Sequence, residues 1–388
     1  MPANPRTIRD KTRQAINAAP HFCFLSIFIK KTGKIMFIPT RKFFKPFNAA
    51  LAALLLACAA PAWAEDIEAQ FRQANAAYQA GNYQQAFHLM QPLAQQGIIV
   101  SAQHNLGLLY FHGRGVAQNY QQAAAWFQKA ADQGYADSQF NLGIMSAEGL
   151  GMMQNHQQAA TWFQKAAGQG HADAQFRLAK LYAWGLGVPQ NHQQAAAWFQ
   201  KVANQGHADA QLFLASMYAE GIGVAQDRQQ AAAWFQKAAE QGHAKAQVYL
   251  GSMYRTGDGV KRNYQQALAW YRKAANQGDA DAQFYLGLMY RIGEGVKRNY
   301  QQALAWYRKA ADQGQADAQN ELGIMYAAGE GVAKNDQQAI EWFNKVLAQP
   351  DTPQNAQAKD SATAQMAFAV LRKPLILQKR LNSKNVPR

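Results

Sequence analysis

Histidine and aspartate, which bind metals and transfer protons in many enzymes, recur in this chain at intervals of 36 residues. Ligands of one zinc ion each lie about 2 Å from the metal, whereas equivalent positions on packed neighbouring helices lie about 10 Å apart. We therefore expect no shared metal site and no catalysis. The histidines are expected on the surface or between helices, and the acids at helix starts. The histidines are His171, His207 and His243 in one register and His156 and His192 in another; the acids are Asp137, Asp173, Asp209, Asp281 and Asp317.

Seven Gly-x-Gly pairs, from Gly113/Gly115 to Gly329/Gly331, keep the same interval. Each pair follows a predicted helix rather than a strand, so we interpret the pairs as turns and not as nucleotide-binding loops. The motifs G-x-x-x-x-G-K-[ST], H-E-x-x-H, G-x-S-x-G and S-x-x-K are absent from the sequence. The chain is therefore predicted to have no enzymatic activity, no metal and no cofactor.

Tryptophan and leucine also repeat every 36 residues, from Trp126 to Trp342 and from Leu106 to Leu322. Repetition in several registers predicts one supersecondary unit copied along the chain. In the copy at residues 246–278, helical spacing predicts a first helix, A, that ends before Gly257. Asn263 is placed as the N-cap of a second helix, B, which ends near Gly278. Each tryptophan lies on helix B, where we expect it to fill the space between helices.

The repeated pattern is A-Q-x-x-L-G-x-M-Y-x-x-G-x-G-V followed by N-Y-Q-Q-A-x-x-W-F/Y-x-K-A-A-x-Q-G. It resembles the Sel1-like repeat family, a branch of the tetratricopeptide-repeat superfamily. The predicted fold is all-α, a right-handed superhelical α-solenoid of antiparallel helix pairs with 36-residue repeats. We expect seven repeats at 102–349, a divergent tetratricopeptide-like N-terminal capping hairpin at 65–101, and a C-terminal capping helix with a basic tail at 350–388.

Residues 1–64 have the pattern of a presequence. Basic residues precede an apolar run at residues 49–60, and an A-x-A site suggests a signal peptide at about 36–64, cleaved after Ala64. Met36 is then the expected start. We predict a periplasmic or secreted protein. The alternative is a lipoprotein anchored through Cys58, because Leu55 to Cys58 resembles a bacterial lipobox; only in that case is a membrane expected as a partner.

The formal net charge of +15 is concentrated at the two ends of the chain. Residues 1–64 carry ten Lys/Arg and one acid, and residues 351–388 carry seven and two. Residues 65–350 carry 22 and 21 and are near neutral. A basic nucleic-acid-binding surface is therefore not expected on the repeats.

Recognition is expected on helix A, because helix B is nearly copied in each repeat and helix A varies along one face. The resemblance implies that this face lines a concave groove for a protein or peptide, with Arg255 and Arg291 suited to an acidic segment. We predict an exported, monomeric, non-enzymatic scaffold. The alternative is a cell-wall or β-lactam-binding or -hydrolysing protein, which the absence of repeat cysteines and of S-x-x-K disfavours. The groove candidates are His104, Phe111, Phe140, Phe176, Lys180, Leu212, Arg255, Phe284, Arg291 and Asn320.

Overall fold

The computed structural model describes residues 29–31, 34–36 and 65–366. The chain divides into two compact units, residues 1–73 and 74–388. In the first unit, strand β1 (Ile29–Lys31) pairs antiparallel with β2 (Lys34–Met36). The predicted apolar run, Cys58 and the cleavage site after Ala64 lie outside the described residues.

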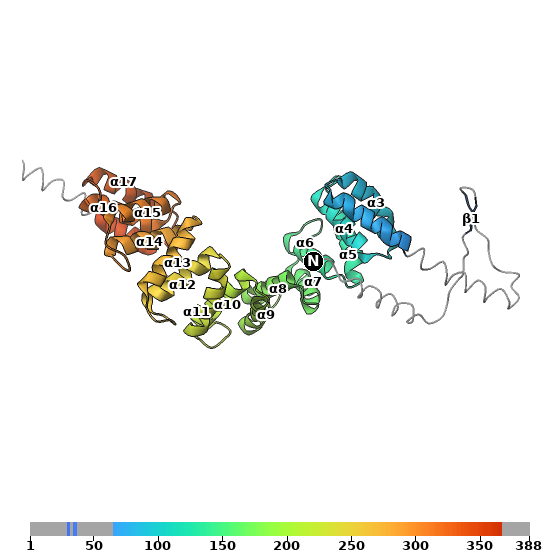
Figure 1. The fold of residues 1–388 in the computed structure, drawn as a ribbon, viewed down its shortest axis with the longest axis horizontal. Coiled ribbons are helices and arrows are strands. Elements are labelled where there is room, and N and C mark those ends of the chain that lie inside the picture. Colours follow the sequence, from blue (N-terminus) through green and yellow to red (C-terminus); the bar gives the residue numbers. More distant parts are fainter. Residues whose placement is uncertain (1–28, 32–33, 37–64, 367–388) are drawn as a thin grey trace, which may run out of the picture. The chain divides into compact units, whose positions relative to one another are not determined.

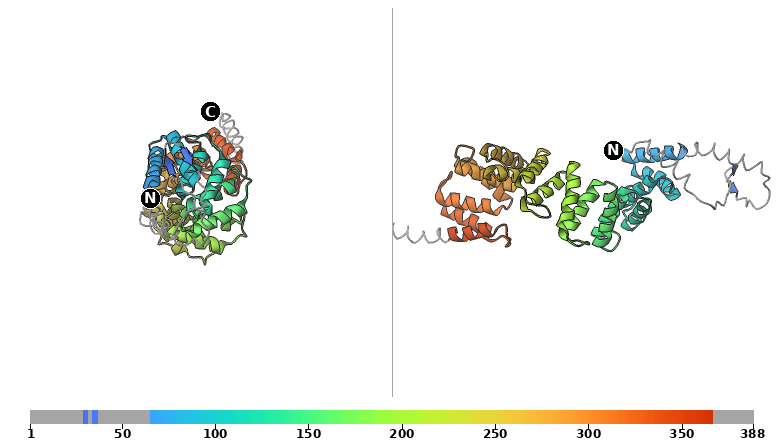
Figure 2. Two further views of the ribbon diagram at one scale, coloured as in Figure 1. Left: turned by 90° about the vertical axis from the view of Figure 1, so that its right-hand side faces the viewer. Right: turned by 90° about the horizontal axis from the view of Figure 1, so that it is seen from below.

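The second unit consists of helices that alternate between the predicted A and B types (Figures 1 and 2). Residues 65–79 are helical and precede α3 (Tyr83–Gln96). The A helices are α4 (Val100–His112), α6 (Ala136–Glu148), α8 (Ala172–Trp184), α10 (Ala208–Glu220), α12 (Ala244–Thr256), α14 (Ala280–Ile292) and α16 (Ala316–Ala328). The B helices are α5 (Tyr120–Asp132), α7 (His156–Gly168), α9 (His192–Asn204), α11 (Arg228–Glu240), α13 (Tyr264–Asn276), α15 (Tyr300–Asp312) and α17 (Asp336–Leu347). Each A helix packs against the B helices that precede and follow it, so the predicted α-solenoid of 36-residue helix pairs is confirmed.

Caps predicted from the sequence define each B helix. The Asn263 side chain accepts hydrogen bonds from the backbone N–H groups of Gln265 and Gln266 at 3.1 Å, which satisfies free donors of the first turn of α13. Gly278 follows this helix with φ +93°, a left-handed conformation that glycine adopts without a steric penalty. The first turn and the end of the helix are therefore both fixed by local sequence.

The second glycine of each Gly-x-Gly pair joins two repeats. Gly259 has φ +71°, and a Cβ built on it would lie 2.1 Å from the carbonyl oxygen of Arg228, at the start of helix α11 in the preceding repeat. The equivalent glycines approach the starts of the preceding B helices in the same way. The pair is therefore more than a turn, because its second residue allows backbone-to-backbone contact between repeats.

The most buried aromatic residue of each repeat is the one after the tryptophan. Tyr271 is fully buried, whereas Trp270 is 9% exposed. The ammonium group of Lys273 lies over the Trp270 ring, 4.1 Å from its centroid. The ring of Tyr271 occupies space left by Gly251 on helix α12, where an added Cβ would lie 2.8 Å from the ring. Trp270 packs in the cluster of the preceding repeat, with Phe235 and Leu250, so the expectation that the tryptophans fill space between helices is confirmed. The following Phe or Tyr is buried more deeply.

A ladder of glutamine side chains also connects neighbouring repeats. The Gln247 side chain donates to the carbonyl of Ala239 at 3.0 Å and accepts from the Gln277 amide at 2.9 Å. The pattern recurs from Gln103 to Gln319. Buried amides with partners on two helices fix the relative position of those helices.

The end of the described chain is closed by a helix at residues 356–366. Ala358 and Ala362 are buried against Phe343 and Tyr326, so the predicted capping helix is present over these residues. The predicted basic tail lies outside the described residues. No helix within the described ranges is both long enough and apolar enough to span a bilayer.

Candidate functional site

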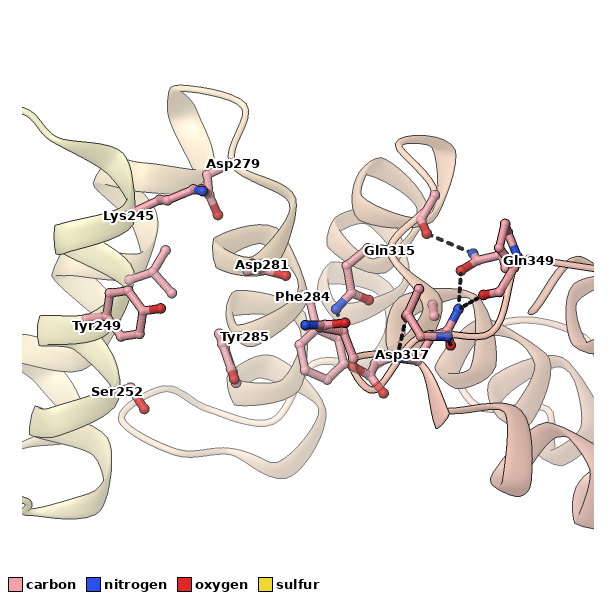
Figure 3. Close-up of a pocket in the computed structure, with 17 residues that line it drawn as sticks. Lys245, Tyr249, Ser252, Asp279, Asp281, Phe284, Tyr285, Gln315, Asp317 and Gln349 are labelled. Carbon is pink, nitrogen blue, oxygen red and sulfur yellow. Dashed lines mark hydrogen bonds between the residues drawn. The ribbon is translucent and has the colours of Figure 1, made fainter. Parts of the chain in front are cut away.

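A cavity of about 610 Å³ lies on the A-helix side of repeats five to seven (Figure 3). Helices α12, α14 and α16 contribute its residues, together with the segment 349–355 that follows α17. Because the three helices belong to successive repeats, the cavity runs across the repeats rather than within one of them. We call it the A-helix groove.

Aromatic side chains form the apolar part of the A-helix groove. Tyr249 and Tyr285 occupy the same position in successive repeats, and both project between the A helices in Figure 3. Tyr285 stacks on the buried Tyr271 with a centroid distance of 5.1 Å. Tyr249 stacks on Phe235 at 5.1 Å and remains 50% exposed. Rings supported from behind in this way present fixed apolar surface to a ligand at a small entropic cost.

Acidic side chains give the A-helix groove a negative charge. Asp279, Asp281 and Asp317 line it, opposed by Lys245 as the one cationic side chain among its lining residues. Burial raises the pKa of Asp317, and the neighbouring Asp281 raises it further. A cationic group that enters the groove would favour the charged carboxylate and so lower the pKa of Asp317.

The predicted cationic residues of this region are already neutralised. Arg255 lies 3.5 Å from a carboxylate oxygen of Glu294. Arg291 contacts the carboxylates of both Glu321 and Glu330, the latter at 2.9 Å. Intrachain glutamates therefore offset the positive charge that Arg255 and Arg291 could offer to an acidic segment. The role of the two arginines as groove residues stays a prediction.

Two of the predicted groove residues are interior residues. His104 is 7% exposed, its Nδ1 lies 2.8 Å from the hydroxyl oxygen of Ser138, and burial lowers its pKa to about 4. Asn320 is 6% exposed and donates to the Ser361 hydroxyl at 2.9 Å. These two side chains join helices to one another and present little surface to a partner, which corrects the sequence-based expectation.

The remaining candidates are half-buried on the A helices. Phe140 stacks on His171 at 4.6 Å and Phe176 stacks on His207 at 4.7 Å. Lys180 lies over the ring of Phe176. Among the predicted residues, Phe284 is the one that the structure places in the A-helix groove. The others, Phe111, Phe140, Phe176, Lys180 and Leu212, stay predictions.

The repeated histidines and aspartates form pairs between repeats. Nδ1 of His171 accepts the backbone N–H of Ala174 at 3.2 Å, and its Nε2 lies 3.3 Å from the Asp137 carboxylate. The hydrogen bond from His171 lowers the pKa of Asp137. His207 and His243 repeat the arrangement, so the expectation that these histidines lie between helices is confirmed. Within residues 65–366, no three His, Cys, Asp or Glu side chains are grouped as metal ligands would be.

Sequence reasoning missed Tyr249, Tyr285, Asp281 and Asp317 as groove residues. The sequence comparison picked out the variable positions of helix A, such as Phe284, and each tyrosine is the next residue after such a position. The acids were assigned to helix starts, where Asp281 and Asp317 do lie. One signal in the sequence could have pointed to these acids. Lys245 stands where the neighbouring repeats have Asp209 and Asp281, so this position varies between repeats as a binding position would.

The fold and the groove define an α-solenoid with an open face on its A helices. The model of the Sel1 repeat matches residues 67–98, 100–135, 136–171, 172–207, 208–243, 244–279, 280–315 and 316–349. These matches cover more than half of the chain, and the chain belongs to the Sel1-repeat family. The first match includes the segment that the sequence pattern had set apart as a capping hairpin. Sel1-repeat chains are generally non-enzymatic scaffolds that mediate protein–protein interaction.

Solved structures are similar to this chain at low sequence identity. A Sel1 repeat protein from Oxalobacter formigenes is 31% identical, with a TM-score of 0.56, over 65% of this chain and 99% of that one. A protective antigen from uropathogenic Escherichia coli is 30% identical, with a TM-score of 0.43, over 81% and 84%. No curated protein matches the chain.

Proposed function

We propose that this protein is an exported scaffold that binds a segment of another protein along its A helices, centred on the A-helix groove. The observation that carries the proposal is the groove itself, where Tyr249, Phe284 and Tyr285 lie beside Asp281 and Asp317. Concave surfaces of helical repeats commonly bind extended partners. The charge favours a cationic segment with apolar side chains.

The size of the groove suits a peptide better than a small metabolite. It crosses three helices, and helix axes lie about 8–10 Å apart, so a bound segment would extend over roughly 20 Å. An extended chain of about six residues covers this length. Stacked aromatic rings would contact its apolar side chains, and the carboxylates would pair with its Lys or Arg side chains.

Export is the second part of the proposal. It rests on the basic, apolar and A-x-A pattern that ends at Ala64. Fractionation of cells that express the tagged chain, followed by N-terminal sequencing, tests it: the mature protein should begin at Glu65. A mature protein that begins at Cys58 and incorporates labelled fatty acid would contradict cleavage at Ala64 and establish the lipoprotein alternative.

Partner capture on the immobilised full chain tests the binding surface. The groove variant Tyr249→Glu/Asp281→Lys changes a ring and a charge within the A-helix groove. The matched control, Gln301→Glu/Asp312→Lys, makes the same change of net charge at exposed positions of helix α15, outside the A helices. Both variants must unfold at temperatures close to that of the unmodified chain before their capture is compared.

The proposal expects that the groove variant loses the proteins that the unmodified chain captures and that the control variant retains them. Equal losses in both variants, or equal retention, would show that capture does not depend specifically on the A-helix groove and would refute the proposal.

A further inference from the structure

The chain itself contains a basic segment with apolar side chains, which is the kind of ligand that the A-helix groove would bind. Residues 367–388, which we call the C-terminal segment, contain six Lys/Arg and no Asp or Glu. Apolar residues alternate with the charges, as in Leu371-Arg372-Lys373 and Leu377-Gln378-Lys379-Arg380-Leu381. The C-terminal segment is therefore strongly basic, whereas the repeats to which it is attached are near neutral.

The A-helix groove complements this segment in both charge and surface. Its lining includes Asp279, Asp281 and Asp317 against Lys245, a formal excess of two negative charges. Burial disfavours the charged form of Asp317 in the unoccupied groove. Basic side chains would offset that cost, and leucine or isoleucine side chains would cover Tyr249 and Tyr285.

The attachment point favours binding within the same chain. The groove is bounded by Gln349, Pro350 and Asn355, which lead directly into the last helix. The described part of that helix runs to Met366, which packs in the cluster around Phe343. Residues 367–388 could span up to about 70 Å if extended, several times the width of the groove. A short tether of this kind gives a local concentration on the order of millimolar.

We propose that the C-terminal segment occupies the A-helix groove of its own chain and competes with the external partner. The inference rests on the proposed function of the groove. An external segment would then have to displace residues 367–388, so the apparent affinity of the partner would be reduced by the fraction of occupied grooves. Cationic partners would be selected over acidic ones, because only they can replace the contacts of the C-terminal segment.

Photo-crosslinking within the purified full chain tests the proposal. A benzophenone amino acid replaces Tyr249, whose ring is half exposed and aromatic, so the substitution is conservative. The control probe replaces Arg177, the exposed residue at the same position two repeats earlier. After irradiation, mass spectrometry identifies the peptide joined to each probe. Mixing isotopically labelled and unlabelled chains separates adducts within one chain from adducts between two chains.

The expected product joins position 249 to residues 367–388 of the same chain, with no such product from position 177. Reversal of four charges, Arg372→Glu/Lys373→Glu/Lys379→Glu/Arg380→Glu, should lower its yield by about tenfold or more. The charge-preserving variant Arg372→Lys/Lys373→Arg/Lys379→Arg/Arg380→Lys should leave the yield unchanged.

Absence of the 249 adduct, equal adducts from both probes, or insensitivity to charge reversal would overturn the proposal. An adduct found only between labelled and unlabelled chains would also overturn it, because it would place the segment on a second copy. Each of these results leaves the proposed function standing, since that function depends on adducts or capture with other proteins. Equal capture of other proteins by the unmodified chain and by the groove variant would refute the proposed function and leave the intrachain adduct intact.

Discussion

Three glycines of the repeat at residues 244–279 distinguish the strain of a left-handed backbone from the contact between repeats. Gly257, Gly259 and Gly278 all have positive φ values, of +84°, +71° and +93°. A Cβ on Gly278 would meet nothing within 4 Å, a Cβ on Gly257 would lie 3.2 Å from Arg262, and one on Gly259 would lie 2.1 Å from the carbonyl oxygen of Arg228. The strain caused by an alanine should therefore increase from position 278 to position 257 and again to position 259.

The cost of each alanine follows from these distances. Left-handed backbone in a residue with a Cβ costs about 1 kcal/mol, and this is the whole expected cost at Gly278. At Gly257 the contact with the Arg262 Cβ is tight but not overlapping, so a shift of a few tenths of an ångström relieves it and adds a smaller cost than at Gly259. At Gly259 the obstacle is backbone, so two repeats must separate, and overpacking of this kind costs a further 1–3 kcal/mol, roughly. Gly259→Ala should thus lower the free energy of unfolding by about 2–4 kcal/mol.

Urea unfolding followed by circular dichroism measures the series. Gly278→Ala is the control for conformational strain alone. In a solenoid, stability is a sum of repeat and nearest-neighbour terms, so Gly259→Ala should also broaden or split the transition as repeats on its two sides lose their coupling. The other two variants should keep the shape of the unmodified transition.

Equal destabilisation by Gly259→Ala and Gly278→Ala would show that the backbone contact of Gly259 does not couple the two repeats. It would mean that the second glycine of the pair serves the turn alone and that coupling between repeats lies in the side-chain contacts, including the glutamine ladder.

Further predictions concern packing and titration. Phe199→Ala should cost about 3–5 kcal/mol in urea unfolding, because Phe199 is 1% exposed, whereas Trp198→Phe should cost less than about 1.5 kcal/mol. Burial lowers the pKa of His104 to about 4, so the unfolded state binds the proton first and stability should fall, by up to roughly 3 kcal/mol, as the pH decreases from about 6.5 to 4. His104→Gln should flatten that dependence. Burial raises the pKa of Asp317, so Asp317→Asn should raise the melting temperature at neutral pH, and the gain should disappear as the pH falls through the folded-state pKa.

The sequence predicted the architecture well because the signals are local and repeated. Asn263 as a cap, Gly257 and Gly259 as a turn, and Gly278 at the helix end each act through their own backbone. Relative burial within helix B was harder to predict. Trp270 and Tyr271 are adjacent, and the helical pattern does not show that Gly251 opens space for the second ring.

The site was predicted less well, because its properties depend on contacts between repeats. The sequence predicted that Arg255 and Arg291 are unpaired. The glutamates that pair with them lie 30 to 39 residues further along the chain, beyond the range of local patterns. The groove's acidity arises where Asp281 and Asp317 of successive repeats meet. Such pairs become visible only when the helices are placed side by side.

Photo-crosslinking in intact cells tests whether a partner protein binds on the A-helix groove. A probe at Tyr249 lies in the groove, and a probe at Gln301 lies on the exposed face of helix α15. We expect a defined adduct with another protein from position 249 and none from position 301. The same adducts from both positions, or adducts with other proteins from position 301 alone, would contradict this expectation.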